Sequence, residues 1–121
     1  MSQVEYDTGA LPEALVVRPR GDIDMAVTPD LKVALVQAVA EHSAGCLVVD
    51  LSSVGYIDSS GIELLFRLHG ALSGDGVDLI VVAPPGSGAA RLLGLVALDD
   101  IGEVRPSLAA ALDTCGDREA R

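Results

Sequence analysis

The apolar residues of this chain form short continuous runs that alternate with stretches of helical spacing. Residues 46–51 and 77–83 are rich in branched apolar side chains and are bounded by glycine, serine or proline. Such runs are typical of strands buried on both faces. Residues 14–20 also predict a strand, and Pro19 indicates that its end lies at a sheet edge or a bulge.

Amphipathic helices are predicted between these strands. The first has Thr28 as its N-cap and Pro29 at its first helical position, and it should stop near residues 43–45. Its apolar positions recur at helical spacing, at Leu31, Ala34, Leu35, Ala38 and Val39. A second helix comes after the strand at residues 46–51, here called the central strand, and ends at Gly74, with Leu64, Leu65, Leu68 and Leu72 at helical spacing.

Smaller elements are predicted towards both ends. Residues 3–6 favour a short edge strand, broken by residues 9–12, and residues 101–105 favour a short last strand. Residues 88–97 predict a third helix that buries Leu92, Leu95 and Val96. A final helix opens at Pro106 and Ser107, with one face formed by Leu108, Ala111, Leu112 and Cys115. We expect residues 1–8 and 117–121 to be loosely ordered.

The order of these elements predicts an α/β fold. Alternating strands and helices imply a largely parallel sheet with right-handed crossovers and helices packed against it. We expect a mixed, mostly parallel sheet of about four to five strands with about four helices. No linker, internal repeat or low-complexity tract divides the 121 residues, so residues 1–121 are expected to form a single domain.

Charge and cysteine content narrow the function classes. A net charge of −10 argues against binding to nucleic acid and against direct contact with an anionic membrane. Cys46 and Cys115 lie far apart in unlike contexts, so we predict neither a disulfide framework nor a metal site, and Cys46 is expected to be a small core residue. Without a signal peptide or a membrane-spanning apolar run, the chain is expected to be reduced and cytoplasmic.

The central strand and the second helix are joined by Asp58-Ser59-Ser60-Gly61. Short hydroxyl and carboxylate side chains at a helix start can accept hydrogen bonds from free backbone N–H groups, so helix capping is one interpretation. One cap explains one of these residues, however, and not all three. A helix N-terminus also favours anions, so a serine exposed there is a reasonable carrier of a covalent phosphate.

Three acids follow strands and could converge at one sheet edge. The loop of Asp22 and Asp24 and the loop of Asp58 come after neighbouring strands. Together the three carboxylates could bind a divalent cation or do acid–base work, whereas the simpler interpretation is that they cap helices and face water. No partner residues complete a catalytic set, so we predict no enzyme activity and no cofactor.

Residues just after the motif allow two interpretations. Gly61 in the first helical turn would leave space for close approach by a partner. Ile62 and Phe66 lie on a stripe offset from the leucine face. If exposed they would form a docking surface, and if buried they would widen the core stripe.

The whole pattern resembles the anti-sigma factor antagonists of the STAS-domain family. The resemblance rests on Ile57-Asp58-Ser59-Ser60-Gly61-Ile62 between a buried strand and a leucine-rich helix. Gly21-Asp22-Ile23-Asp24 is similar to the family's Gly-x-x-Asp segment, and residues 77–83 followed by Arg91-Leu92-Leu93 are similar to its penultimate strand and third helix. The resemblance covers almost the whole chain. Glu63 departs from it, because a small or apolar residue is expected there.

The resemblance implies a switchable binding module that regulates bacterial transcription, as in stress responses or sporulation. Such a protein binds a GHKL-type serine kinase that acts as an anti-sigma factor, and so frees a sigma factor. Phosphorylation of Ser59 would end the complex, and a PP2C-type phosphatase would restore it. The antagonist would be a monomer or weak dimer. The implied partner-binding residues are Asp22, Asp24, Asp58, Ser60, Gly61, Ile62 and Phe66.

Two other functions remain as alternatives. Some STAS domains are subunits of membrane transporters or of larger signalling assemblies, and such a role would not depend on Ser59. A small enzyme that uses Asp24, Asp58 and Ser59 is the other alternative, although it lacks a base or a metal set.

Overall fold

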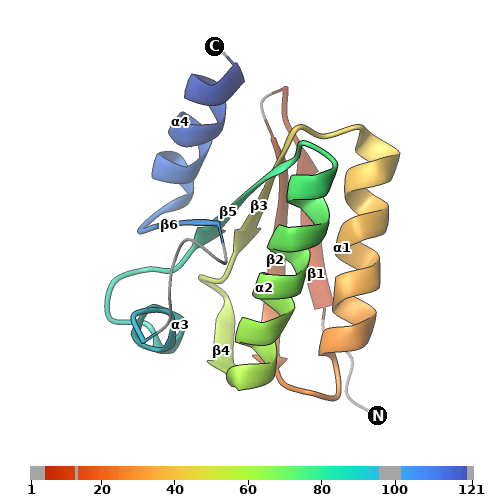
Figure 1. Cartoon of the computed structure of the whole chain (residues 1–121). Coiled ribbons are helices and arrows are strands. Elements are labelled where there is room, and N and C mark those ends of the chain that lie inside the picture. Colours follow the sequence, from red (N-terminus) through yellow and green to blue (C-terminus); the bar gives the residue numbers. More distant parts are fainter. Residues whose placement is uncertain (1–4, 13, 96–101, 120–121) are drawn as a thin grey trace.

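The computed structural model describes residues 5–12, 14–95 and 102–119 (Figure 1). Its strands are β1 (Glu5–Ala10), β2 (Leu15–Ile23), β3 (Cys46–Asp50), β4 (Val54–Ile57), β5 (Asp78–Val82) and β6 (Glu103–Arg105). Its helices are α1 (Thr28–His42), α2 (Ser59–Gly74), α3 (Gly88–Leu93) and α4 (Leu108–Glu119).

The sheet is mixed and mostly parallel, as predicted. Its main path runs β1-β2-β3-β5-β6, in which only the pair of β1 and β2 is antiparallel. It contains six strands, rather than the expected four to five, because a strand between the central run and the motif was missed. This strand, β4, lies off the main path and pairs in parallel with the far end of β2.

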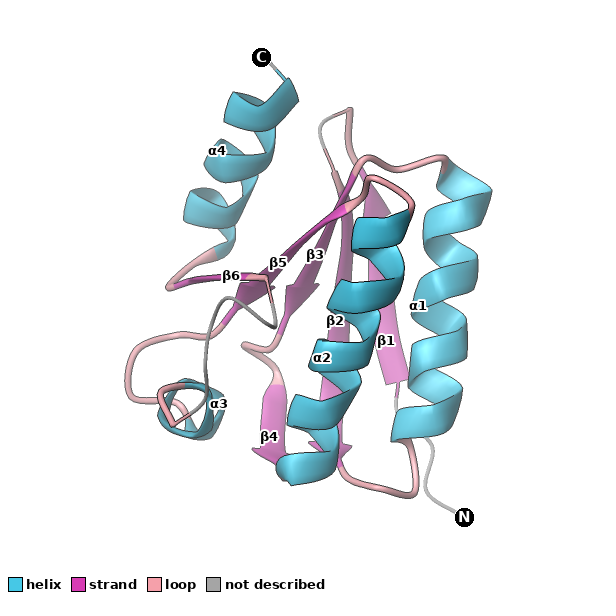
Figure 2. Cartoon of the chain, viewed as in Figure 1, coloured by secondary structure: helices cyan, strands magenta, loops and turns pink. Residues whose placement is uncertain are grey.

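The two faces of the sheet are covered unequally (Figure 2). Helices α1 and α2 lie side by side, and together with α3 they pack on one face over the larger hydrophobic cluster. Helix α4 packs on the opposite face against β3, β5 and β6. Strands β3 and β5 are buried almost throughout because helices cover both of their faces, which explains their continuous apolar sequence.

Several element boundaries differ from the predicted ones. Helix α1 begins at Thr28 itself, so the N-cap position falls on Val27, which makes no side-chain cap. The carbonyl of Asp24 instead accepts the N–H groups of Val27 and Thr28, both at 3.1 Å. At the other end, the left-handed residue Ser43 closes the helix near the predicted position.

Helix α3 is shorter than the sequence pattern suggested. It ends at Leu93, and its buried residues are Ala89 and Leu93, whereas Leu92 is only partly buried. The side chain of Leu95 is 82% exposed, so the prediction that it is buried was wrong. Val96 lies outside the described residues.

Regular structure extends further towards both ends of the described chain than the predicted elements do. Residues 5–8 belong to β1, which continues through Gly9 to Ala10, and α4 extends to Glu119. The predicted short last strand is β6, and the part of that prediction at residue 101 lies outside the described residues. Among the described helices, none is both long and apolar enough to cross a bilayer.

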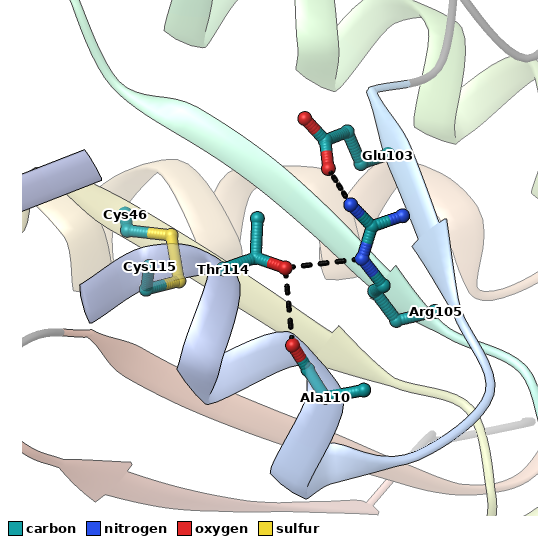
Figure 3. The surroundings of a disulfide bond; sticks show 6 residues. All are labelled: Cys46, Glu103, Arg105, Ala110, Thr114 and Cys115. Atoms are coloured by element: carbon teal, nitrogen blue, oxygen red, sulfur yellow. Dashed lines mark hydrogen bonds and ion pairs between the residues drawn. A yellow bond between two sulfur atoms is a disulfide. The ribbon is translucent and has the colours of Figure 1, made fainter. Parts of the chain in front are cut away.

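The expectation that the cysteines are reduced and unlinked was wrong. Cys46 at the start of β3 and Cys115 in α4 form a disulfide across a sequence separation of 69 residues (Figure 3). Their Cα atoms are 6.1 Å apart, within the range that a disulfide spans. The prediction that Cys46 is a core residue is confirmed, since both residues are buried. Spacing along the chain could not show the pair, because only the packing of α4 brings it together.

Candidate functional site

The motif sits where β4 passes into α2, and β2 holds it there. Ile57 at the end of β4 pairs with Ile23 at the end of β2. The N–H of Asp58 then donates to the carbonyl of Ile23 at 3.3 Å. The prediction that the loop of Asp22 and Asp24 and the loop of Asp58 are neighbours is therefore confirmed. The loop of Asp58 follows β4, however, and not the central strand.

Asp58 is the N-cap of α2. Its carboxylate accepts the backbone N–H of Ser60 at 2.9 Å and, at 3.4 Å, that of Gly61. The Ser60 hydroxyl also donates to the same carboxylate oxygen. That hydroxyl bond is the largest cause that lowers the pKa of Asp58; desolvation opposes it, and backbone hydrogen bonds, including those from Ser60 and Gly61, lower the pKa further. Asp58 therefore keeps its negative charge to a lower pH than an ordinary aspartate.

The two serines of the motif differ in their surroundings. Ser60 is half-buried and its hydroxyl is held by Asp58. Ser59 is exposed at the first helical position, and no hydrogen bond joins its hydroxyl to any residue in the described part of the chain. Capping thus accounts for Asp58 and Ser60, and it leaves Ser59 unexplained.

Gly61 and Ile62 face the interior of the protein. A Cβ on Gly61 would lie 2.5 Å from Cγ1 and 2.8 Å from Cδ1 of Ile57, so glycine clears space for the chain's own core. The interpretation that it clears space for a partner needs correcting accordingly. Ile62 is only 5% exposed and belongs to the core, so it widens the buried stripe, as the second interpretation held. Phe66 is partly buried and packs against the same core.

The three acids do not form a metal site. Asp24 accepts the N–H of Ala26 at 2.9 Å through its carboxylate, which is a local turn interaction. Asp22 is exposed on β2, opposite Tyr56 in β4. No group of three or more His, Cys, Asp or Glu side chains in the described ranges is arranged to hold a metal ion. Whether Asp22 and Asp24 contact a partner stays a prediction.

Charged residues follow Ser59 along the exposed side of α2. Glu63 lies one helical turn after Ser59, and its carboxylate accepts hydrogen bonds from Nε and Nη2 of Arg67 at 3.0 and 2.6 Å. A hollow of about 330 Å³ opens between α1 and α2 beside this pair, lined also by Lys32 and Ser60. The departure at Glu63 therefore places a partly compensated carboxylate next to the motif.

One buried charge was missed in the sequence. Asp50 is 1% exposed at the end of β3, where its carboxylate accepts Nε of Arg18 and the N–H of Ser52, both at 3.0 Å. The sequence could have indicated this interaction, because Asp50 lies in an otherwise apolar run and a carboxylate inside a buried strand needs a partner. The pair joins β2 to β3 on the sheet face of α4.

The family model for the STAS domain matches residues 5–111, which is most of the chain. The chain belongs to the STAS domain family. A solved anti-sigma factor antagonist from Mycobacterium paratuberculosis is 30% identical, with a TM-score of 0.81, and the match covers 94% of this chain and 95% of that one. The recognised family and the fold expected from it are confirmed.

Two solved forms of another STAS protein share the fold at lower identity. SpoIIAA, an anti-sigma factor antagonist, matches in its unphosphorylated form at 15% identity with a TM-score of 0.67, covering 96% of this chain and 98% of that chain. The phosphorylated form of the Bacillus protein matches at 15% identity with a TM-score of 0.63, covering 91% and 98%. This STAS domain therefore has the fold of anti-sigma factor antagonists.

Proposed function

We propose that this STAS domain is an anti-sigma factor antagonist controlled by phosphorylation of Ser59. The unmodified protein binds an anti-sigma factor of the GHKL serine kinase type and thereby frees a sigma factor. The kinase transfers the γ-phosphoryl group of ATP to Oγ of Ser59, which loses its proton, and ADP is released. The modified antagonist then dissociates, until a PP2C-type phosphatase hydrolyses the phosphate ester.

The observation that carries this proposal is the difference between the two serine hydroxyls. Ser59 is exposed and its hydroxyl has no hydrogen-bond partner among the described residues, whereas the hydroxyl of Ser60 is held by Asp58. Ser59 can therefore enter the active site of another protein without breaking an internal hydrogen bond. Modification of Ser60 would first have to break its bond to the helix cap.

The surroundings of Ser59 explain how a phosphate would act as a switch. A phosphate adds roughly −1.5 to −2 charges at neutral pH. Helix N–H groups often neutralise such a group, but those of Ser60 and Gly61 already bind Asp58. Glu63, one turn further on, adds another carboxylate to the same side of the helix. The new charge would therefore keep its hydration and stay at the surface.

A partner that covers Ser59 must remove this water. Burying an uncompensated charge is costly, and a loss of about 1.4 kcal/mol already weakens binding tenfold. We therefore expect phosphorylation, or an aspartate at position 59, to weaken the complex by more than about tenfold.

In this proposal the chain is the substrate of a kinase and catalyses no reaction itself. The absence of a catalytic role is supported by the hydrogen bonds of the two candidate acids. Asp24 binds the turn that follows it, and Asp58 binds the first turn of α2. Neither carboxylate hydrogen-bonds to the Ser59 hydroxyl in the described structure, so neither is placed to activate it as a nucleophile.

The proposal is tested by recovering partners from native lysate with added ATP or ADP, followed by mass spectrometry. The baits are wild type, Ser59→Ala, Ser59→Asp and Ser73→Asp. Ser73 is exposed near the other end of α2, so its aspartate adds the same charge away from the motif. With ADP, we expect an ATP-binding kinase with wild type, Ser59→Ala and Ser73→Asp, but not with Ser59→Asp. With ATP, which lets the kinase modify Ser59, wild type should lose the kinase while Ser59→Ala keeps it.

Equal recovery of that kinase by Ser59→Asp would refute the switch. Recovery of an integral-membrane complex by all four baits would instead support the transporter alternative. Incubation with the recovered kinase and ATP should then place phosphate on Ser59 in wild type and on no residue of Ser59→Ala.

A further inference from the structure

The sheet face under α4 is held together differently from the face under α1 and α2. Among the described helices, α4 alone packs on this face. The strands beneath it contribute apolar side chains from β2, β3 and β5, namely Val16, Val48, Ile80 and Val82. Helix α4 is therefore the cover that keeps water from this side of the sheet.

The noncovalent contacts of α4 are modest. Its fully buried residues in this cluster are Ala111 and Cys115, both of which have small side chains, while Leu108 and Leu112 are only partly buried. Since hydrophobic stabilisation scales with the apolar area that is buried, this helix contributes less than α2, which buries several leucines.

A polar contact between β6 and α4 is partly exposed. Nε of Arg105 in β6 donates to Oγ1 of Thr114 at 3.0 Å, and that hydroxyl donates back to the carbonyl of Ala110 within α4 (Figure 3). The Arg105 guanidinium also pairs with Glu103. These groups are partly exposed, so water can replace each of their hydrogen bonds at little cost.

We propose that the Cys46–Cys115 disulfide is a redox-controlled latch that fixes α4 on this sheet face. While the bond is intact, α4 cannot leave the start of β3 by more than the reach of two cysteine side chains. When the bond is reduced, α4 loses its covalent attachment and is held by noncovalent contacts alone, which in the described part of the helix include two small buried side chains and a partly exposed hydrogen bond. Helix α4 then detaches locally and exposes the valine and isoleucine side chains beneath it.

The chemical step is thiol–disulfide exchange with a dithiol reductant. A thiolate of the reductant attacks one sulfur, the bond between the two cysteine sulfurs breaks, and the leaving cysteine takes up a proton. The second thiol of the reductant resolves the mixed disulfide. The protein gains two electrons and two protons, and the reductant becomes a disulfide. The reverse reaction with an oxidised dithiol closes the latch.

Burial controls the speed of this step. Cys46 is 2% exposed and Cys115 is 0% exposed, so a reductant cannot reach either sulfur in the closed structure. Reduction must wait for transient opening of α4, and its rate will follow that opening. The latch is thus expected to respond slowly to a change in redox conditions, and faster in variants that loosen α4.

This inference goes beyond the proposed function, because the latch and Ser59 lie in different parts of the fold. The disulfide belongs to the cluster on the α4 face, and α2 packs in the cluster on the other face. Moreover, β3 begins with Cys46, and Figure 1 shows that β3 starts at the end of the sheet far from β4 and the start of α2. Redox state and phosphorylation would therefore act on separate surfaces of one small domain.

The test is hydrogen–deuterium exchange of the full chain with and without a small dithiol, followed by mass spectrometry. Thiol titration of the unfolded protein first establishes that two thiols appear only after reduction. We expect amide exchange in α4 to rise roughly tenfold or more on reduction, while exchange in α1 and α2 on the other face stays unchanged. The Cys46→Ala/Cys115→Ala variant should resemble the reduced protein and should not respond to the dithiol.

A matched control removes the polar contact and keeps the disulfide. Thr114→Val deletes the acceptor of Arg105. In its oxidised form, exchange in α4 should rise much less than it does when wild type is reduced, while its disulfide should be reduced faster than that of wild type. The latch is refuted if reduction leaves α4 exchange unchanged, or if it speeds exchange equally in every element. Free thiols in the air-oxidised protein would also overturn it.

Discussion

The tight packing around Gly61 leads to a sharp prediction for Gly61→Ala. Alanine is normally preferred to glycine in a helix by up to about 1 kcal/mol. Here the added methyl group would lie 2.5 Å and 2.8 Å from two side-chain carbons of Ile57, and 3.2 Å from Cγ2 of Ile23. These side chains belong to the core, so they cannot turn into solvent to make room.

The two effects oppose each other, and their magnitudes decide the sign. Overpacking a core by one methyl group costs roughly 1–3 kcal/mol. The gain in helix propensity is smaller than its full value, because Gly61 lies in the first turn of α2. We therefore expect Gly61→Ala to lower the free energy of unfolding by about 1–2 kcal/mol and Tm by roughly 5 °C.

Thermal and urea unfolding of two further variants isolate the cause. Gly70 lies in the same helix, and a Cβ there would meet nothing within 4 Å. Gly70→Ala should therefore stabilise the protein by up to about 1 kcal/mol. In an Ile57→Ala background, which removes the clashing carbons, Gly61→Ala should lose most of its cost. The reasoning fails if Gly61→Ala is as stable as wild type, or if its cost is the same in both backgrounds.

Two more predictions concern the charged residues. Arg18→Met should destabilise the protein by about 1–3 kcal/mol in urea unfolding, because it leaves the buried carboxylate of Asp50 without its counter-charge, and adding Asp50→Asn should restore part of that loss. No recovery in the double variant would contradict this account. The lowered pKa of Asp58 contributes stability that is complete above the ordinary aspartate pKa and is lost as pH falls through the lowered folded value. The difference in Tm between wild type and Asp58→Asn should therefore shrink as the pH is lowered through the acid range. Ser60→Ala removes the main cause of the lowered pKa of Asp58, so its decline should be smaller and should be complete at a higher pH than that of wild type. A constant difference would disprove the assignment.

The sequence allowed most of the fold to be predicted because its main strands and helices bury broad faces. The continuous apolar runs of β3 and β5 reflect strands that are buried on both faces. The leucine spacing of α2 reflects a helix that is buried on one face. β4 was missed because only Ile57 at its end is buried, while Gly55 and Tyr56 in it are exposed. A strand that is paired on one side and mostly exposed leaves little periodicity to read.

The position of the candidate site could be predicted from the sequence, but the separate roles of its residues could not. The motif at a helix start was evident, and the structure then separated the capping residues from the exposed Ser59. Long-range partners could not be read from spacing. The disulfide, the bond between Arg18 and Asp50, and the contact of Gly61 with Ile57 all depend on which strands become neighbours.

The path of β2 has a mechanical consequence for the motif. Its first part, at residues 15–17, is paired with β3, and its last part, at residues 21–23, is paired with β4 after an irregularity between Gly21 and Asp22. The start of α2 is thus attached to the far end of one strand, and not to the ladder formed by β3 and β5. Force applied at Ser59 by a docking protein would bend this end of β2 at its irregularity, and the register of the central ladder would be left intact.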